Sequence, residues 1–183
     1  MASRSKEENV LQLILENSPL KEWHFEEIVR EAHVTKLVAN KWLKKYVSER
    51  LLTHIKRKGK FPYFTVGRNN PVYYSLKRVY ALEQLHTCGL IPKLLSLKTA
   101  KTIILFGSII KGDWYKYSDI DIFVFGDASD FDKKIYERKL RRDLELHIFQ
   151  NIEDIEDVRT GLIKNIINGY VLKGQIQDIV EVA

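Results

Sequence analysis

Three segments in the second half of the chain have the hydrophobic pattern of β-strands. Residues 102–106 are apolar and rich in β-branched side chains, and Gly107 and Ser108 follow them, which predicts a buried strand that ends in a tight turn. Residues 119–125 form a second apolar run, and residues 144–149 alternate between apolar and polar positions with a period of two. These strands, separated by helical segments, predict a small α/β (α+β) domain built on a mixed sheet.

Helical segments are expected between and after these strands. A charged amphipathic helix is predicted to begin at Asp130, with Ile135 among the residues of its inner face. Residues 162–167 predict a further helix, and residues 169–174 predict a short terminal strand.

The first half of the chain has the periodicity of three helices. Ser5 and Glu8 have the spacing of a capping box at the start of the first helix. Apolar positions over residues 25–32 predict a short second helix. Thr35 is the expected N-cap of a third helix that runs to about residue 48.

A basic hairpin is predicted after the third helix. Residues 51–55 and 61–66 have the composition of strands, and four of the five residues between Ile55 and Phe61 are Lys or Arg. Three helices followed by a basic hairpin resemble a winged helix-turn-helix domain, in which the third helix enters the major groove of DNA and the wing contacts the backbone.

Charge is distributed unevenly along the chain. Residues 1–96 carry 17 Lys and Arg against 9 Asp and Glu, whereas residues 97–183 carry 13 against 15. A basic module joined to a mildly acidic one indicates that the first module faces an anion. We therefore expect a winged-helix domain at residues 1–75, a helical connector at 76–97 and a sheet-containing domain at 98–183.

The expected DNA-binding residues come from the polar side of the third helix and from the hairpin tip. They are Lys36, Asn40, Lys41, Lys44, Lys56, Arg57, Lys58 and Lys60. A second interpretation stays open, because winged helices also serve as protein-docking or dimerisation modules and a lysine-rich helix face is often only a solvated surface.

Two carboxylates lie at the start of the predicted strand 119–125. Asp119 and Asp121 are two residues apart, so both side chains are expected to project from one face of the strand. Adjacent negative charges repel unless a cation lies between them, and Mg²⁺ prefers oxygen ligands of this kind. The pair therefore predicts a site for a divalent metal ion.

The order Gly-Ser, three residues, Gly and then Ser-Asp-x-Asp resembles the signature of the DNA polymerase β nucleotidyltransferase superfamily, and it looks most like the minimal nucleotidyltransferase branch. The matching residues are Gly107, Ser108, Gly112, Ser118, Asp119 and Asp121. The resemblance implies that the Gly-Ser turn holds the triphosphate of ATP or another NTP and that the two aspartates bind Mg²⁺ or Mn²⁺. It also implies a third metal-binding carboxylate on a neighbouring strand.

Glu145 matches this third carboxylate by its place on the strand 144–149, although the family usually has Asp there. His147, on the same face, is either a hydrogen-bond donor to a carboxylate or phosphate or an ordinary strand residue. Lys111 is expected to neutralise charge on the triphosphate, or else to be a solvent-exposed lysine. Ser118 is expected to steady the loop before Asp119.

Two functions follow from this pattern. The first is a Mg²⁺-dependent nucleotidyltransferase that transfers a nucleoside monophosphate from an NTP to a hydroxyl acceptor and carries a module for double-stranded DNA. The resemblance implies an antitoxin-like role, with a HEPN-type protein partner supplied in trans as the acceptor. The second is a DNA-binding transcriptional regulator whose nucleotidyltransferase-like domain is inactive and binds a nucleotide or partner; Glu145 in place of Asp keeps this alternative open.

The remaining sequence features bear on location. No segment approaches the ~20 apolar residues of a membrane helix, and the N-terminus lacks the apolar region of a signal peptide. The single cysteine, Cys88, excludes an intrachain disulfide. We therefore expect a cytoplasmic protein without membrane association, with the helical connector as a possible seam of a homodimer.

Overall fold

The protein forms two compact units. The structure, a computed structural model, describes residues 6–66, 70–156 and 158–180. Residues 1–77 make up the first unit and residues 78–183 the second. No helix in the described part of the chain is both long enough and apolar enough to cross a membrane.

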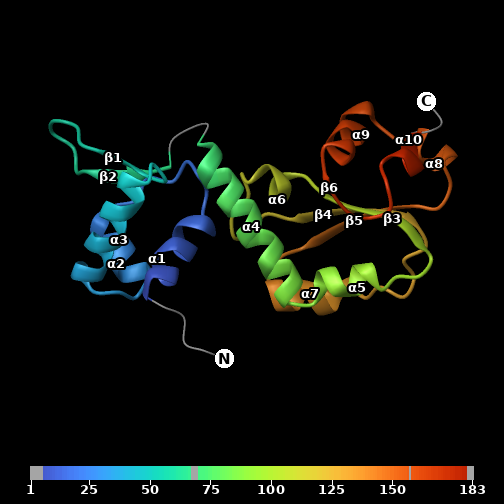
Figure 1. Cartoon of the computed structure of the whole chain (residues 1–183), viewed down its shortest axis with the longest axis horizontal. Helices are drawn as coiled ribbons and strands as arrows, with labels where there is room; N and C mark the ends of the chain where they lie inside the picture. The colour runs from blue at the N-terminus through green and yellow to red at the C-terminus, as the bar shows by residue number, and fades with distance from the viewer. Residues whose placement is uncertain (1–5, 67–69, 157, 181–183) are drawn as a thin grey trace. The chain divides into compact units, whose positions relative to one another are not determined.

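In the described part of the first unit, three helices precede a two-stranded antiparallel hairpin (Figure 1). The helices are α1 (Lys6–Leu15), α2 (Phe25–Glu31) and α3 (Lys36–Ser48), and the strands are β1 (Thr53–Ile55) and β2 (Tyr63–Thr65). Helix α4 (Pro71–Thr87) begins in this unit and ends in the second. The sequence predicts these elements in this order; Ser5 of the expected capping box lies outside the described residues.

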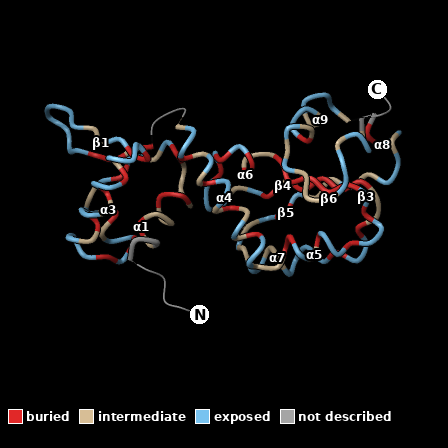
Figure 2. The backbone as a smooth tube through the Cα atoms, viewed as in Figure 1, coloured by how far each residue is buried: buried red, intermediate tan, exposed pale blue. Residues whose placement is uncertain are grey.

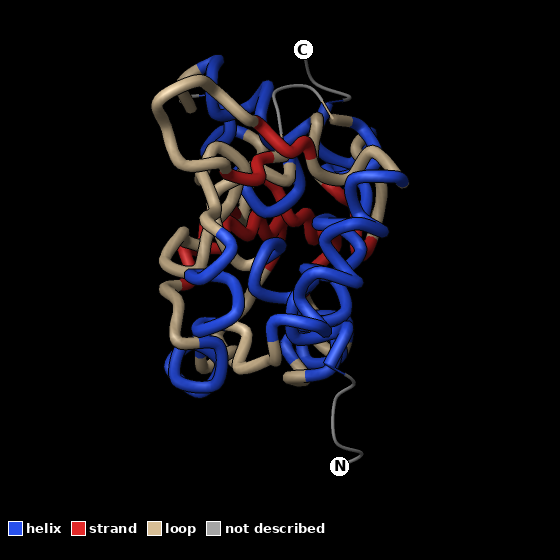
Figure 3. Tube along the Cα trace, turned by 90° about the vertical axis from the view of Figure 1, so that its left-hand side faces the viewer, coloured by secondary structure: helices blue, strands red, loops and turns tan. Residues whose placement is uncertain are grey.

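Local hydrogen bonds explain where the third helix and the hairpin of the first unit are placed. Thr35 caps α3 as predicted, since its hydroxyl oxygen accepts a hydrogen bond of 3.4 Å from the N–H of Val38. Trp23 is buried and exchanges two backbone hydrogen bonds of 2.8 Å with Phe64 of β2. The hairpin is thereby fixed to the helical part of its unit, while residues 56–60 at its tip are exposed and extend beyond the short strands (Figure 3).

A four-stranded mixed sheet in the order β5-β4-β3-β6 forms the centre of the second unit. Its strands are β3 (Ala100–Phe106), β4 (Ile120–Gly126), β5 (Leu144–Phe149) and β6 (Tyr170–Lys173). Strand β3 pairs antiparallel with β4 and β6, and β4 pairs in parallel with β5. The predicted strands are all present, and β4 begins at Ile120, one residue later than the sequence indicates.

Helices lie on both faces of this sheet (Figure 1), and its central strands are buried (Figure 2). Alternate residues of β3 and β4 enter two different cores. Ile103 and Ile122 point to the face covered by α5 (Leu90–Leu95) and α7 (Lys133–Leu140). Ile104 and Phe123 point to the opposite face, against α8 (Glu153–Glu156) and α9 (Thr160–Ile167). The short helices α6 (Ser108–Lys111) and α10 (Gln177–Val180) complete the unit. The mixed α/β fold expected from the sequence is confirmed.

The start of the charged helix differs from the prediction. Its N-cap is Asp132 rather than Asp130, because the carboxylate of Asp132 accepts a hydrogen bond of 3.0 Å from the N–H of Lys134. Ile135, expected on the inner face, is 40% exposed. Tyr136 and Leu140 pack against the core instead, because residues four apart lie on one face of a helix, whereas Ile135 is five residues from Leu140.

Candidate active site

A glycine turn packs the end of β3 directly against β4. Gly107 has φ 71° and ψ −149°, a backbone conformation that is essentially restricted to glycine. A Cβ atom at this position would lie only 2.0 Å from Oδ2 of Asp121. The turn therefore needs a residue without a side chain, both for its own conformation and to leave room for the Asp121 carboxylate.

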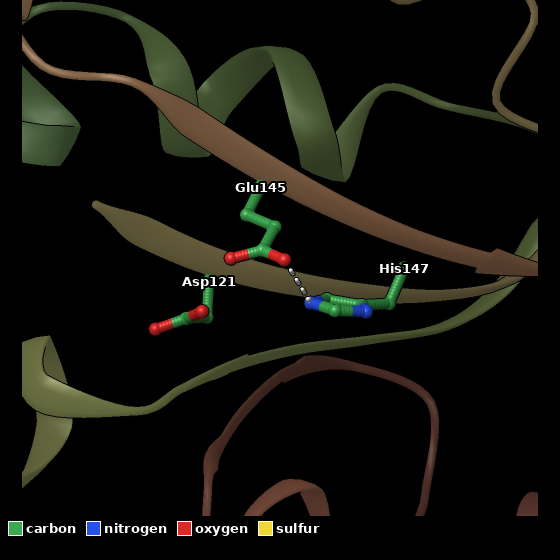
Figure 4. Close-up of side chains that lie close together, drawn as sticks. All are labelled: Asp121, Glu145 and His147. Carbon is green, nitrogen blue, oxygen red and sulfur yellow. Dashed lines mark ion pairs between the residues drawn. The ribbon is translucent and has the colours of Figure 1, made fainter. Parts of the chain in front are cut away.

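Asp121, Glu145 and His147 form a cluster of potential metal ligands on two neighbouring strands (Figure 4). Asp121 of β4 is in register with Glu145 of β5, and His147 lies two residues farther along β5, so the three side chains share one face of the sheet. One ligand atom from each residue lies within 4.8 Å of the other two. Nε2 of His147 is 3.7 Å from Oε1 of Glu145.

The cluster contains a half-buried carboxyl group, Asp121, whose ionised form is disfavoured in the metal-free protein. Burial raises the pKa of Asp121, and repulsion from Glu145 and Asp119 raises it further, while the His147 imidazole acts in the opposite direction. A divalent cation between the carboxylates would remove this repulsion. The donor set fits such an ion, because two carboxylates from adjacent strands converge beside a third potential ligand.

Asp119 lies beside the cluster rather than in it. The residue immediately precedes β4 and is exposed, and within the described part of the chain its carboxylate is not among the converging ligand atoms. Arg142 holds this segment, since its Nε donates to the carbonyl of Ser118 at 2.6 Å and its Nη2 to the carbonyl of Asp119 at 3.4 Å. The structure thus brings Asp121 and Glu145 together and leaves Asp119 next to them.

Arg142 is a site residue that the sequence analysis did not predict. Burial lowers the pKa of its guanidinium to about 10, although Asp119 and Asp121 act to raise it, so it stays charged at neutral pH. The guanidinium carbon lies 5.0 Å from the centre of the Trp114 ring, within the range of a cation–π contact. The available signal was a pair of arginines, at 141 and 142, shortly before the strand that carries Glu145.

The predicted nucleotide-binding residues surround the glycine turn and the loop that follows. Ser108 is the first residue of α6, directly after Gly107. The ammonium of Lys111 donates to Oδ1 of Asn165 in α9 at 3.1 Å, on the sheet face that carries the ligand cluster. The hydroxyl of Ser118 accepts a hydrogen bond of 3.0 Å from the N–H of Tyr115, which is a loop-steadying contact of the kind the sequence suggests.

All eight predicted DNA-binding residues lie on the first unit, on α3 or at the hairpin tip, and the four of the tip are exposed. Two of those on α3 have partners: Lys36 forms an ion pair of 2.7 Å with Glu26, and the ammonium of Lys41 lies 5.0 Å from the centre of the Trp42 ring. The four cations of the hairpin tip are presented on one short loop, so their charges add at close range.

Comparison with protein families identifies the segment that contains the cluster. Residues 90–177 match the family model described as polymerase beta, nucleotidyltransferase. The matched segment covers just under half of the chain and includes the glycine turn, the ligand cluster and the four-stranded sheet. The match does not extend to the first unit.

Two solved structures have a distant likeness to the chain. One, a toxin–antitoxin complex with AMP-PNP, is 22% identical, with a TM-score of 0.35 over 56% of this chain and 77% of that chain. The other, a mutant of the toxin–antitoxin pair MntA–HpeT, is 22% identical, with a TM-score of 0.33 over 55% and 75%. TM-scores of this size are too low to support a functional argument. No protein of curated function matches the sequence.

Proposed function

We propose that the protein is a Mg²⁺-dependent enzyme that moves a nucleoside monophosphate from an NTP to a hydroxyl acceptor. The proposal starts from the match of residues 90–177 to the polymerase beta nucleotidyltransferase family model. The observation that carries this proposal is the convergence of the Asp121 and Glu145 carboxylates, in register on neighbouring strands, beside the turn at Gly107.

Asp119, Asp121 and Glu145 are the proposed catalytic residues and metal ligands. A divalent ion held by these carboxylates would neutralise charge on the phosphates and lower the pKa of the acceptor hydroxyl. Asp121 is positioned by the turn at Gly107, and Glu145 by its register with Asp121. Asp119 belongs to the set through its place two residues before Asp121, where Arg142 holds its backbone.

The proposed binding site for the triphosphate consists of the glycine turn and the start of α6. Gly107 lets a phosphate approach the backbone closely, and the hydroxyl of Ser108 is a donor for a phosphate oxygen. Lys111 supplies positive charge when it exchanges its bond to Asn165 for a phosphate oxygen. Ser118 acts indirectly, by holding the loop that leads to Asp119.

Calorimetric titration of the full chain with ATP, with and without Mg²⁺, tests the proposal. We expect Mg²⁺ to tighten ATP binding by about tenfold or more, because the phosphates and the carboxylates otherwise repel each other. Absence of ATP binding in the presence of Mg²⁺, in protein shown to be folded by circular dichroism, would contradict the enzymatic proposal. That result would favour the alternative of a DNA-binding regulator with an inactive second unit.

The first unit is proposed to be a winged-helix domain that binds double-stranded DNA. Support comes from the order of its elements and from the cations on α3 and on the hairpin tip. The acceptor of the nucleotide is proposed to be a protein supplied in trans, of the HEPN type that the sequence resemblance implies.

Removal of charge at the hairpin tip is expected to weaken DNA binding in a salt-dependent way. In the variant Lys56→Ala/Arg57→Ala/Lys58→Ala, the negative slope of log K against log[salt] should become less steep by about 1 for each phosphate contact that is lost. Fluorescence anisotropy with a duplex of mixed sequence, measured at several salt concentrations, gives this slope.

The matched control removes the same charge from the second unit. Lys98, Lys116 and Lys134 are exposed there, and their replacement by Ala should leave the salt slope unchanged. Equal effects of the two triple substitutions would show that only net charge matters, and would contradict a DNA-binding role of the hairpin.

A further inference from the structure

The ligand cluster contains a nitrogen donor in addition to its carboxylates. The imidazole of His147 lies on the same face as Asp121 and Glu145, and its Nε2 is directed at Glu145 (Figure 4). The distance of 3.7 Å between Nε2 and Oε1 is longer than a hydrogen bond. The nitrogen and the carboxylate therefore face each other without forming a hydrogen bond.

Packing holds the imidazole in this position. The side chain of His147 is only 19% exposed, and its ring centre lies 5.3 Å from that of Phe106, at the end of β3. In the sheet, His147 is in register with Phe123, one of the fully buried residues of this face. A ring fixed by such contacts loses little conformational entropy when its nitrogen binds an ion.

We infer that His147 is a metal ligand and that the cluster selects a divalent transition ion, Mn²⁺ in particular, over Mg²⁺. The inference concerns the site used in the proposed function and deepens it by naming the ion. It requires that Asp121, Glu145 and His147 bind one ion together, which their spacing within 4.8 Å permits.

The selectivity follows from the chemistry of the three donors. Mg²⁺ prefers oxygen ligands, keeps several waters and gains little from an imidazole, so carboxylates alone suffice for it. An imidazole suits first-row transition ions, among which Mn²⁺ binds most weakly, so the preference inferred here is over Mg²⁺ and not over the later ions. Mn²⁺ accepts carboxylate, water and phosphate oxygens as well, so it is the ion that suits both this donor set and a bound triphosphate.

The experiment titrates the full chain with Mn²⁺ in the absence of nucleotide and follows free Mn²⁺ by electron paramagnetic resonance, with Mg²⁺ added as a competitor. We expect the dissociation constant for Mn²⁺ to be at least about tenfold lower than that for Mg²⁺. With Co²⁺ as the probe, visible absorption should report binding and a nitrogen-containing coordination sphere.

The decisive variant is His147→Phe, which removes the nitrogen and retains a ring against Phe106. We expect it to weaken Mn²⁺ binding about tenfold or more and Mg²⁺ binding by much less, so that the preference for Mn²⁺ is lost. His147→Gln offers only an amide, so its affinities for Mn²⁺ and Mg²⁺ should be close to those of His147→Phe. This second variant provides the test if His147→Phe fails to fold.

His86→Ala is the matched control, because His86 is an exposed imidazole of the same unit outside the cluster. It should bind Mn²⁺ and Mg²⁺ as the parent does. Equal preference for Mn²⁺ in the parent and in the His147 variants would overturn the inference, as would equal affinity of the parent for both ions.

Failure of this inference and failure of the proposed enzyme give different results. If His147 is not a ligand but the enzyme proposal holds, Mg²⁺ supports ATP binding and the His147 variants keep their metal affinities. If the enzyme proposal fails but the inference holds, Mn²⁺ binds selectively through His147 and no metal-dependent binding of ATP follows.

Discussion

Replacement of Asp121 by Asn is expected to abolish metal-dependent binding of ATP while leaving the metal-free protein at least as stable as the parent. The carboxylate is the member of the cluster that touches the glycine turn and pairs in register with Glu145. Because the substitution removes a charged metal ligand, we expect the affinity for ATP in the presence of Mg²⁺ to fall by about 100-fold or more. Titration calorimetry measures this loss directly.

The effect on stability has the opposite sign for a physical reason. The pKa of Asp121 is raised, chiefly by burial, so the folded metal-free protein disfavours the ionised carboxylate. Between the ordinary pKa and the raised one the folded state binds more protons than the unfolded state, so stability falls as pH rises through that window. Asn carries no charge and removes this cost, so the melting temperature at neutral pH should stay equal or increase.

Two outcomes of the Asp121→Asn experiment would contradict the site as described. Unchanged ATP affinity in Mg²⁺ would mean that the cluster does not hold the metal. A lower melting temperature would mean that the carboxylate makes a stabilising contact in the metal-free protein. Asp119→Asn is the matched comparison, because Asp119 is exposed and lies beside the cluster, and its effect on ATP affinity should be smaller.

Replacement of Gly107 by Ala should disrupt the site and destabilise the second unit. The backbone at φ 71° and ψ −149° costs a residue with a side chain about 1–3 kcal/mol, and the new Cβ would lie 2.0 Å from Oδ2 of Asp121. The turn or the carboxylate must then move. We expect a loss of about 2–4 kcal/mol in the free energy of unfolding, measured in urea, together with loss of ATP binding.

Controls separate the two causes of this effect. Gly161 lies in α9 without a positive φ, and a Cβ added there would meet no atom within 4 Å, so Gly161→Ala should be neutral or stabilise the protein by about 0.5–1 kcal/mol. In an Asp121→Ala background, the close contact between the new Cβ and the carboxylate is absent. Gly107→Ala should therefore reduce the free energy of unfolding by less there than in the parent. Full additivity of the two substitutions would show that the contact with Asp121 does not matter.

Local sequence signals were sufficient for many of the elements that build this site. The period of two over residues 144–149 predicts both β5 and the shared face of Glu145 and His147, because neighbours two apart on a strand project from the same face. Gly107 was recognisable as a turn because it follows a buried apolar run. Such features depend on a few consecutive residues.

Other features depend on contacts between distant segments, and no local pattern contains them. Asp121 meets Glu145 only because β4 and β5 pair in parallel in one register, and a shift of one residue would turn Glu145 to the other face. Strand β4 begins one residue later than predicted, so Asp119 lies outside the strand. Arg142 reaches the backbone carbonyl of Asp119 only because β4 and β5 are neighbours in the sheet.

Local patterns of residues were enough to predict the α/β class, the glycine turn, the strands and two aspartates with the spacing of a metal site. The convergence of His147 with Asp121 and Glu145 required the folded sheet. The physical reason is that strand register is set by the burial of alternate side chains in two cores on opposite faces of the sheet, which is a property of the whole unit.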